Sequence, residues 1–396
     1  MTVERRNCRV WRRGVPCVCL GLLTCALVLV SPAPWTGPAL HAQTAEQVAE
    51  RIAETAAANL RGPEPPPEFE LDTSWPKPLP NNWGLGQVWG VAVDARDHVW
   101  VVHQIASPRY IQPIRDAGQE PAPAVLEFDQ EGNLLQAWGE SGQGGWTQGA
   151  GRPFPAQAIN VDWEGNIWVS EETRGNAVVK FSPEGRFLLQ IGHVTRTNGS
   201  GDTTLLGGPS GVDFYEPDNE VFIADGYRNQ RVIVFDAQSG EYKRHWGRFG
   251  LPPNDNFEPG DQPTWGPSPF LIGRPPNMSP NLPRFVHGVN VSRDGLVYVA
   301  DRSHSMLYVH RTDGTFVAEK KLPGPFNSVT FSPDPEQQYI YAGGMNATAR
   351  IFILRRSDLE MLGSFSSSGQ HYMDTDSHGN LYTCGQRMPQ RWLLKD

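Results

Sequence analysis

Beyond its first 42 residues the sequence is almost free of cysteine. The five cysteines are Cys8, Cys17, Cys19, Cys25 and Cys384. With Cys384 alone in residues 43–396, this part of the chain has no pair for an intramolecular disulfide and no Cys-rich metal site. Any metal site there must use other residue types.

Basic residues are also scarce. The chain has 34 Lys and Arg against 43 Asp and Glu, and charged residues make up only 19% of it. Removal of residues 1–42 takes away five Arg and one Glu, which leaves 29 basic and 42 acidic residues and a net charge of −13. This balance argues against nucleic acid or an anionic membrane surface as a partner.

Long apolar runs are few, and the clearest one lies near the start of the chain. Five arginines precede the apolar run 15–30, and the small residue Ala42 follows it at a plausible cleavage position. This order predicts an export signal over residues 1–42, a secreted or periplasmic protein, and no stable membrane insertion after cleavage. The alternative is an uncleaved membrane anchor, for which a 16-residue run is short.

Glycine, proline and tryptophan are abundant instead, with 41, 35 and 13 copies. Such a composition favours many short strands joined by tight turns. Between the signal and this strand-rich region, residues 43–66 read as a short surface helix with Val48, Ile52 and Leu60 on one face, followed by a Pro-rich linker. We expect one further domain over residues 67–396.

One pattern recurs through that domain: a small residue, an alternating strand, an Asp/Gly turn and a second apolar strand. The six copies span 90–104, 158–172, 211–226, 288–302, 328–344 and 372–385. Most are followed by two more strand-like runs, so the sequence predicts an all-β, six-bladed β-propeller with four-stranded blades. The last copy lacks one strand, which residues 68–75 would supply to close the ring; an open sandwich is the alternative.

Alignment of the copies identifies one equivalent position just before each first strand. The six residues are Trp89, Gln157, Ser210, His287, Asn327 and His371. First strands line the channel of a propeller, so we expect a ring of these side chains at one mouth. His287, His371 and Gln157 would converge from alternate blades. The other histidines, including His103, His304 and His310, fall outside this register and are expected at the surface or in turns.

Two neutral imidazoles aimed at one axis suit zinc or a similar divalent cation, with Gln157 as a weak third ligand. The other interpretation is a hydrogen-bonded polar ring around water. At the ends of the second strands, Tyr227 and Arg302 are the candidates for ligand contact, because a phenol can accept a proton and an Arg fork can hold a carboxylate. Asp225 and Asp301 there are expected to cap turns.

The repeats resemble NHL repeats, and two runs, IADGYRNQRVIVFDAQSGEYKRHWG (223–247) and VHGVNVSRDGLVYVADRS (286–303), are similar to the peptidyl-α-hydroxyglycine α-amidating lyase domain. That resemblance implies a six-bladed propeller with zinc held by three His, a Tyr as base and Arg on the substrate carboxylate. The reaction it implies splits a peptide ending in α-hydroxyglycine into a peptide amide and glyoxylate. His287 and His371 match two zinc ligands, Tyr227 the base and Arg302 one Arg.

The sequence also departs from this family. Gln157 stands at the position of the third His, Gln104 at that of an Arg, and Gly369 at that of a Met. Tyr372 replaces an Asp that helps to bind a structural calcium, which makes calcium doubtful here, and Arg228 occupies the position of a disulfide Cys.

Two functional hypotheses follow. The first is an exported propeller of the peptidylamidoglycolate lyase type, whose channel mouth holds a divalent metal and binds or acts on a small or peptide-like anion. The second is a non-catalytic propeller that binds a protein or small ligand through its channel face. A hydrolase or lactonase with a carboxylate-rich calcium centre ranks last, since the ring lacks such a centre.

Overall fold

A computed structural model describes eight stretches of the chain. They are residues 65–105, 108–139, 156–171, 175–194, 197–255, 286–344, 349–385 and 387–395. The predicted signal peptide, helix and most of the linker lie outside the described residues, so their boundaries stay predictions. In the described part, no helix has the length and apolar character needed to cross a membrane.

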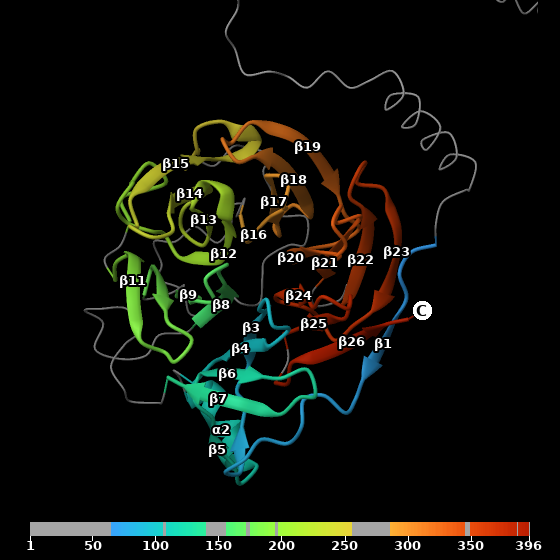
Figure 1. Cartoon of the computed structure of the whole chain (residues 1–396). Coiled ribbons are helices and arrows are strands. Elements are labelled where there is room, and N and C mark those ends of the chain that lie inside the picture. Colours follow the sequence, from blue (N-terminus) through green and yellow to red (C-terminus); the bar gives the residue numbers. More distant parts are fainter. Residues whose placement is uncertain are drawn as a thin grey trace, which may run out of the picture. The chain divides into compact units, whose positions relative to one another are not determined.

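Six four-stranded antiparallel sheets are arranged around a central axis, as Figure 1 shows, and they confirm the predicted propeller. Blades 1 to 3 consist of β3 (Val88–Val93), β4 (Val99–His103), β6 (Val125–Phe128) and β7 (Leu134–Trp138); β8 (Ala156–Val161), β9 (Ile167–Glu171), β10 (Ala177–Phe181) and β11 (Phe187–Gly192); and β12 (Pro209–Tyr215), β13 (Glu220–Asp225), β14 (Arg231–Asp236) and β15 (Tyr242–Trp246).

Blades 4 to 6 complete the ring. They consist of β16 (Gly288–Val291), β17 (Leu296–Asp301), β18 (Met306–Arg311) and β19 (Phe316–Lys321); β20 (Phe326–Phe331), β21 (Tyr339–Gly344), β22 (Arg350–Arg355) and β23 (Met361–Ser366); and β24 (Met373–Thr375), β25 (Leu381–Thr383), β26 (Gln390–Leu394) and β1 (Phe69–Asp72). The helix α2 (Pro108–Asp116) and the parallel pair β2 (Trp83–Gly84) and β5 (Glu120–Pro121) lie outside the blades.

The ring closes as the sequence predicts. β1 pairs antiparallel with β26, with Phe69 opposite Leu394 and Asp72 opposite Arg391. The Arg391 Nε donates to the Asp72 carboxylate at 3.0 Å. A strand from the start of the domain thus completes the last blade, and each end of the domain is held by the other.

The hydrophobic core is divided among the six interfaces between neighbouring blades. At the interface of blades 3 and 4, for example, Phe222 and Val234 pack in one cluster with Val297 and Tyr308. A cluster with Trp75, Val91 and Tyr382 joins blade 6 to blade 1. Alternation along each strand supplies these apolar side chains to both faces of a sheet, so the core lies between blades and leaves the channel to polar residues.

Two histidines differ from expectation. His103 in β4 and His310 in β18 are 1% and 0% exposed, although the sequence pattern suggests surface or turn positions. His103 is accommodated by polar contacts, because its Nδ1 accepts from the Gly86 N–H at 2.9 Å and its Nε2 lies 2.9 Å from the Pro123 carbonyl oxygen. At both positions a polar residue type, which alone suggests exposure, is therefore buried by the packing of the sheets.

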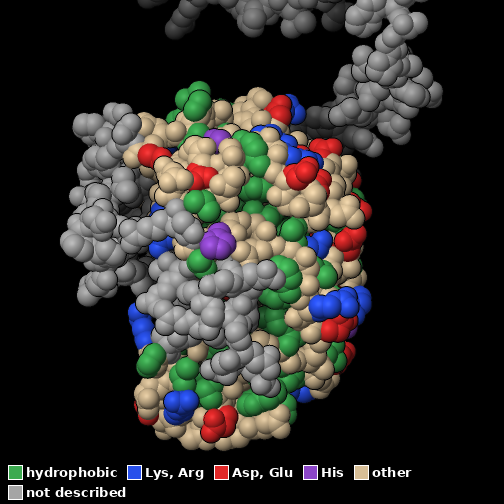
Figure 2. All heavy atoms as spheres, turned by 90° about the vertical axis from the view of Figure 1, so that its left-hand side faces the viewer, with side chains coloured by type: hydrophobic (Ala, Val, Ile, Leu, Met, Phe, Trp, Pro, Cys, Tyr) green, Lys and Arg blue, Asp and Glu red, His purple; other side chains and the backbone are tan. Residues whose placement is uncertain are grey.

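The outer surface of the blades carries charged side chains of both signs (Figure 2). Figure 2 shows Lys and Arg side chains close to Asp and Glu side chains on the face it draws, with hydrophobic side chains between them. Exposed apolar residues of the outermost strands include Phe187, Leu188 and Tyr242. The candidate functional residues lie instead along the channel.

Candidate functional site

The six ring residues lie at one end of the innermost strands, which we call the first mouth. In β3, β8, β12 and β20 the register shifts at the start of the strand, between Val88 and Gly90 in β3 and between Ala156 and Ala158 in β8. Such a bulge leaves one residue unpaired and turns its side chain. In β3 and β8 the unpaired residues are Trp89 and Gln157.

Four of the predicted site residues meet there. The Gln157 Nε2 donates to the Tyr227 hydroxyl at 2.6 Å and to the His371 Nε2 at 3.0 Å. The Tyr227 hydroxyl in turn lies 3.3 Å from the His287 Nε2, to which it donates. The rings of His287 and His371 are 5.1 Å apart between centroids. Residues from blades 2, 3, 4 and 6 thus form one connected cluster.

Backbone carbonyls fix both imidazoles. The His287 Nδ1 lies 2.9 Å from the Asn327 carbonyl oxygen, and the His371 Nδ1 lies 2.6 Å from that of Trp89. A carbonyl oxygen only accepts, so each Nδ1 carries the proton and each Nε2 keeps its lone pair for the cluster. This is how metal-binding histidines are commonly oriented.

Both rings are neutral near pH 7. Burial lowers the pKa of His371 to about 3, and the positive charge of Arg302 acts in the same direction. Burial also lowers the pKa of His287 well below its usual value, with Arg302 and His371 contributing. Neutral imidazoles are the form that binds metals.

The cluster fits a divalent cation in two of its three candidate ligands. His287 and His371 are 2% exposed and present unprotonated Nε2 atoms. Gln157, 3% exposed, directs its amide nitrogen toward His371 and Tyr227 in this conformation, and a nitrogen that donates is not a ligand. The residues that would hold an ion are therefore the two histidines, with Gln157 available only after rotation of its amide.

Arg302 lies beside this cluster. Its guanidinium carbon is 5.6 Å from the centre of the Tyr227 ring, and its Nη1 reaches the Asn327 Oδ1 only at 3.4 Å. Among the described residues its buried Nε has no hydrogen-bond partner. The neighbouring Asp301 binds the His304 Nδ1 at 2.7 Å and the Arg248 Nη2 at 3.4 Å, so the charge of Arg302 remains available to an anion.

The turn that carries Tyr227 is held by a buried ion pair. The Arg231 Nε donates to the Asp225 carboxylate at 2.9 Å, and both side chains are 0% exposed. Gly226 precedes Tyr227, and a Cβ there would lie 1.7 Å from the Val286 carbonyl oxygen. Asp225 therefore does more than the predicted turn cap, whereas Asp301 accepts from the His304 N–H at 3.0 Å as a cap should.

Gln104 and Tyr372, where the sequence differs from the amidating lyase domain, both form hydrogen bonds beside the channel. The Gln104 Nε2 donates to the Ala156 carbonyl oxygen at 2.5 Å, next to Gln157. The Tyr372 side chain crosses the channel, because its hydroxyl donates to the Ser210 carbonyl oxygen at 2.6 Å and lies 3.0 Å from that of His287. At Gly211 a Cβ would lie 2.9 Å from that hydroxyl, so glycine makes room for it.

A second group that the sequence did not suggest lies in blade 1. Ligand atoms of Asp94, His98 and Glu127 all lie within 4.8 Å of one another, close enough to hold a metal ion. The Arg96 Nη2 already lies 2.7 Å from the Asp94 carboxylate and 3.0 Å from that of Glu127. The Arg96 side chain is 60% exposed, so this group is covered by a cation at the surface.

Each buried histidine is expected to make the fold less stable in acid. Burial lowers the pKa of His103 and His310 to about 4, and His287 and His371 are lowered too. A His in the unfolded chain takes up a proton below about pH 6.5, whereas the buried ring stays neutral. Each buried ring therefore lowers the free energy of unfolding by up to about 1.4 kcal/mol for every unit by which the pH falls. Four buried aspartates act in the opposite sense.

Burial raises the pKa of Asp213 to about 7 and of Asp374 to about 6, so their protonation stabilises the fold as the pH falls. Burial raises the pKa of Asp225 and Asp301 too, so the effect of a buried histidine is isolated by removing one ring. Between pH 6 and pH 5 the variant His310→Phe should lose about 1 kcal/mol less of its free energy of unfolding than the unaltered protein does. Urea unfolding of both proteins at pH 7, 6 and 5 measures the difference. Equal pH dependence of the two proteins would contradict the assignment.

The chain is similar to known proteins at low sequence identity. No family model matches the chain. Peptidylglycine α-amidating monooxygenase of Rattus norvegicus is 27% identical over 201 residues, 47% of this chain and 18% of its own length. Peptidyl-glycine α-amidating monooxygenase B of Xenopus laevis is 23% identical over 269 residues, 64% of this chain and 26% of its own length. The match thus spans about a quarter or less of these relatives.

Solved structures cover more of the chain, at lower identity. The WD40 β-propeller domain of Doa1 has a TM-score of 0.48 and 8% identity, and covers 80% of this chain and 82% of its own. A streptogramin B lyase has a TM-score of 0.46 and 11% identity, and covers 83% of this chain and 98% of its own. The chain is a six-bladed β-propeller whose sequence resembles, at low identity, part of the peptidylglycine α-amidating monooxygenases.

Proposed function

We propose that the chain is an exported lyase-like propeller that binds a small or peptide-like carboxylate at its first mouth, with a divalent metal, zinc or a similar ion, on His287 and His371. The observation that carries this proposal is the convergence of two neutral imidazoles, the Tyr227 hydroxyl and Arg302 on one buried spot. The resemblance to the amidating enzymes supplies the substrate class, a peptide ending in α-hydroxyglycine. Export through residues 1–42 belongs to the same proposal.

The residues take distinct roles in it. A bound divalent ion would polarise the ligand hydroxyl and make its proton more acidic. Arg302 would hold the carboxylate through its guanidinium, since its Nε and one of its Nη groups have no strong partner among the described residues. Tyr227, between Gln157 and His287, would accept the hydroxyl proton as a phenolate, a form that the charge of a bound ion would favour. The carbon–oxygen double bond of glyoxylate would form as the carbon–nitrogen bond breaks. The proton held by Tyr227 would pass to the amide nitrogen, so that peptide amide and glyoxylate leave.

Loss of the Arg302 charge should weaken carboxylate binding selectively. Arg302→Ala is expected to reduce affinity for an N-benzoylated α-hydroxyglycine by about 10- to 100-fold, because a charge-assisted hydrogen bond contributes roughly 1.5–3 kcal/mol. The corresponding primary amide, which lacks the carboxylate, should bind equally to both proteins. Calorimetric titration measures both affinities.

The matched control is Arg186→Ala, which removes an exposed arginine from the edge of blade 2. It should bind both compounds as the unaltered protein does. Equal loss of affinity for acid and amide in Arg302→Ala would show that Arg302 does not recognise the carboxylate.

A second candidate is a non-catalytic propeller that binds a ligand or protein at the same mouth. The Gln157 amide favours it, because it occupies the Nε2 of His371 and contacts the Tyr227 hydroxyl. Release of glyoxylate from an α-hydroxyglycyl peptide by metal-loaded protein separates the two. Binding without glyoxylate supports the non-catalytic propeller, and in that case Tyr227→Phe changes affinity alone.

A further inference from the structure

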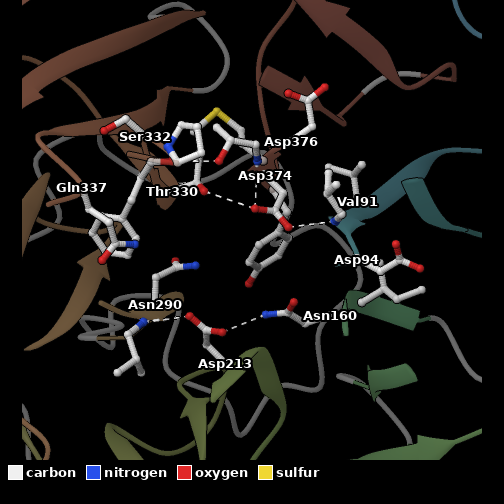
Figure 3. Close-up of a pocket in the computed structure, with 18 of the residues that line it drawn as sticks. Val91, Asp94, Asn160, Asp213, Asn290, Thr330, Ser332, Gln337, Asp374 and Asp376 are labelled. Atoms are coloured by element: carbon white, nitrogen blue, oxygen red, sulfur yellow. Dashed lines mark hydrogen bonds between the residues drawn. The ribbon is translucent and has the colours of Figure 1, made fainter. Parts of the chain in front are cut away.

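A cavity of about 340 Å³ opens at the other end of the channel, which we call the second mouth. The innermost strands run from the first mouth to the second, and the side chains near their far ends line this cavity (Figure 3). Five of the six strands contribute a polar residue at an equivalent position. These residues are Asn160, Asp213, Asn290, Thr330 and Asp374.

The cavity is separate from the candidate site at the first mouth. The Tyr372 side chain, which also lines the cavity, crosses the channel to carbonyl oxygens of Ser210 and His287. Its ring offers an apolar surface at the inner end of the cavity. A ligand at the second mouth would therefore not touch Tyr227 or Arg302.

Two aspartates on different blades supply acceptors. The Asp213 Oδ2 accepts from the Val291 N–H at 2.7 Å, and the Asp374 Oδ2 accepts from the Val93 N–H at 2.8 Å. These bonds link neighbouring blades and fix each carboxylate in place. Each Oδ2 can accept a second donor, whereas the Oδ1 of Asp213 already accepts from Asn160 and Phe214 and the Oδ1 of Asp374 from Thr330 and Thr375. Figure 3 shows Asp213 and Asp374 on different sides of the open space.

The remaining charges in the lining already have partners. Asp94 binds Arg96, Asp97 accepts from Ser377, and Asp376 accepts from Asn380. The Arg293 Nη1 donates to the Pro333 and Asp334 carbonyl oxygens. Among the described residues, the cavity rim therefore carries no cluster of unpaired like charges.

Two amides supply donors. Gln337 is 8% exposed, and its Oε1 accepts from the Arg293 N–H at 2.8 Å, which leaves its Nε2 to the cavity. Asn290 lines the same cavity from the adjoining blade, and among the described residues its buried Oδ1 has no hydrogen-bond partner. The Asn290 amide therefore offers the cavity both a donor and an acceptor. Both residues are labelled beside the open space in Figure 3.

Carboxylate acceptors and amide donors together select the ligand. A cation would face the unpaired N–H groups, and an anion would face the two carboxylates. A hydroxyl donates to a carboxylate and accepts from an amide at once, so several hydroxyls on a compact framework satisfy both kinds of group. Burial, which raises the pKa of Asp213 and Asp374, reduces the net charge of the cavity and favours a neutral ligand further.

We propose that the second-mouth cavity binds a neutral polyhydroxylated ligand of monosaccharide size, through Asp213, Asp374, Asn290 and Gln337. This site goes beyond the proposed function of the first mouth and does not depend on it.

Direct titration tests the proposal. D-Glucose, D-galactose and D-mannose are offered one at a time to the full chain in calorimetry and in saturation-transfer NMR, with calcium chloride and putrescine as charged probes. At least one hexose should bind saturably at one site per chain. Asn290→Ala and Gln337→Glu should each weaken that binding about 10-fold or more. Asn290→Ala removes a donor and a free acceptor, and Gln337→Glu removes a donor while it keeps the acceptor for the Arg293 N–H.

Two controls accompany the variants. Gln238→Ala removes an exposed amide elsewhere and should bind sugar normally. Arg302→Ala should also bind it normally, which distinguishes failure here from failure at the first mouth. Circular dichroism checks the fold of every variant. The proposal is overturned if no hexose binds saturably, if only the charged probes bind, or if folded Asn290→Ala and Gln337→Glu both retain full affinity.

Discussion

Replacement of both His287 and His371 by alanine is expected to abolish binding of a divalent ion at the first mouth. Both rings are buried, neutral and oriented by backbone carbonyls, so the two Nε2 atoms are the nitrogen ligands that this mouth offers. Metal content measured by mass spectrometry, after loading with zinc and removal of the excess, should fall from about one ion per chain to near zero.

The matched control is His310→Ala. His310 is as buried as the two channel histidines but lies in β18, within the blade, so its loss should leave the metal content unchanged. A second comparison uses His98→Ala, which removes one member of the group in blade 1. Metal that persists in the double variant and disappears in His98→Ala would move the metal site to blade 1 and contradict the proposed one.

Replacement of Arg231 by methionine is expected to lower the free energy of unfolding by about 3–5 kcal/mol, because it leaves the buried Asp225 carboxylate without its counter-charge. Arg231 also donates to the carbonyl oxygens of Ser200 at 2.8 Å and Leu205 at 2.9 Å. Burial already raises the pKa of Asp225 even with this partner present. Urea unfolding at pH 7 measures the loss.

Arg355→Met serves as the control, because Arg355 pairs with Asp358 at the surface, where an ion pair contributes about 0–1 kcal/mol. The double variant Asp225→Asn/Arg231→Met should recover part of the loss by removing the uncompensated charge. A loss below about 1 kcal/mol in Arg231→Met would show that the pair is not a main support of this turn.

Repetition made the fold predictable from sequence. Each copy reports the same alternation, so six weak strand patterns reinforce one another, and the missing strand of the last copy identified residues 68–75, of which Phe69–Asp72 pair with β26. The same register predicted which residues meet at the first mouth. Gln157, His287 and His371 hold equivalent positions of a closed ring, which face one axis, and Tyr227 follows the second strand of blade 3 at the same mouth. These four residues come from four blades and form one connected cluster.

The sequence did not predict features that depend on how blades approach each other. Residue type suggested the surface for His103 and His310, but each lies in a strand between packed sheets. The group of Asp94, His98 and Glu127 joins two strands of blade 1, and no spacing along the chain marks it. The same holds for Gln337 and Asn290, which reach one cavity from neighbouring blades.

The sequence by itself therefore determined the number of blades, their closure and the residues of the first mouth, because these follow from a periodic pattern. Only the tertiary structure decided how each of these side chains is oriented and which atoms it contacts. It showed that Gln157 turns its amide nitrogen to His371, and that Tyr372 crosses the channel and divides it into two separate mouths. Amide orientation and channel filling depend on contacts across the axis, between residues far apart in the sequence, and a linear pattern does not record them.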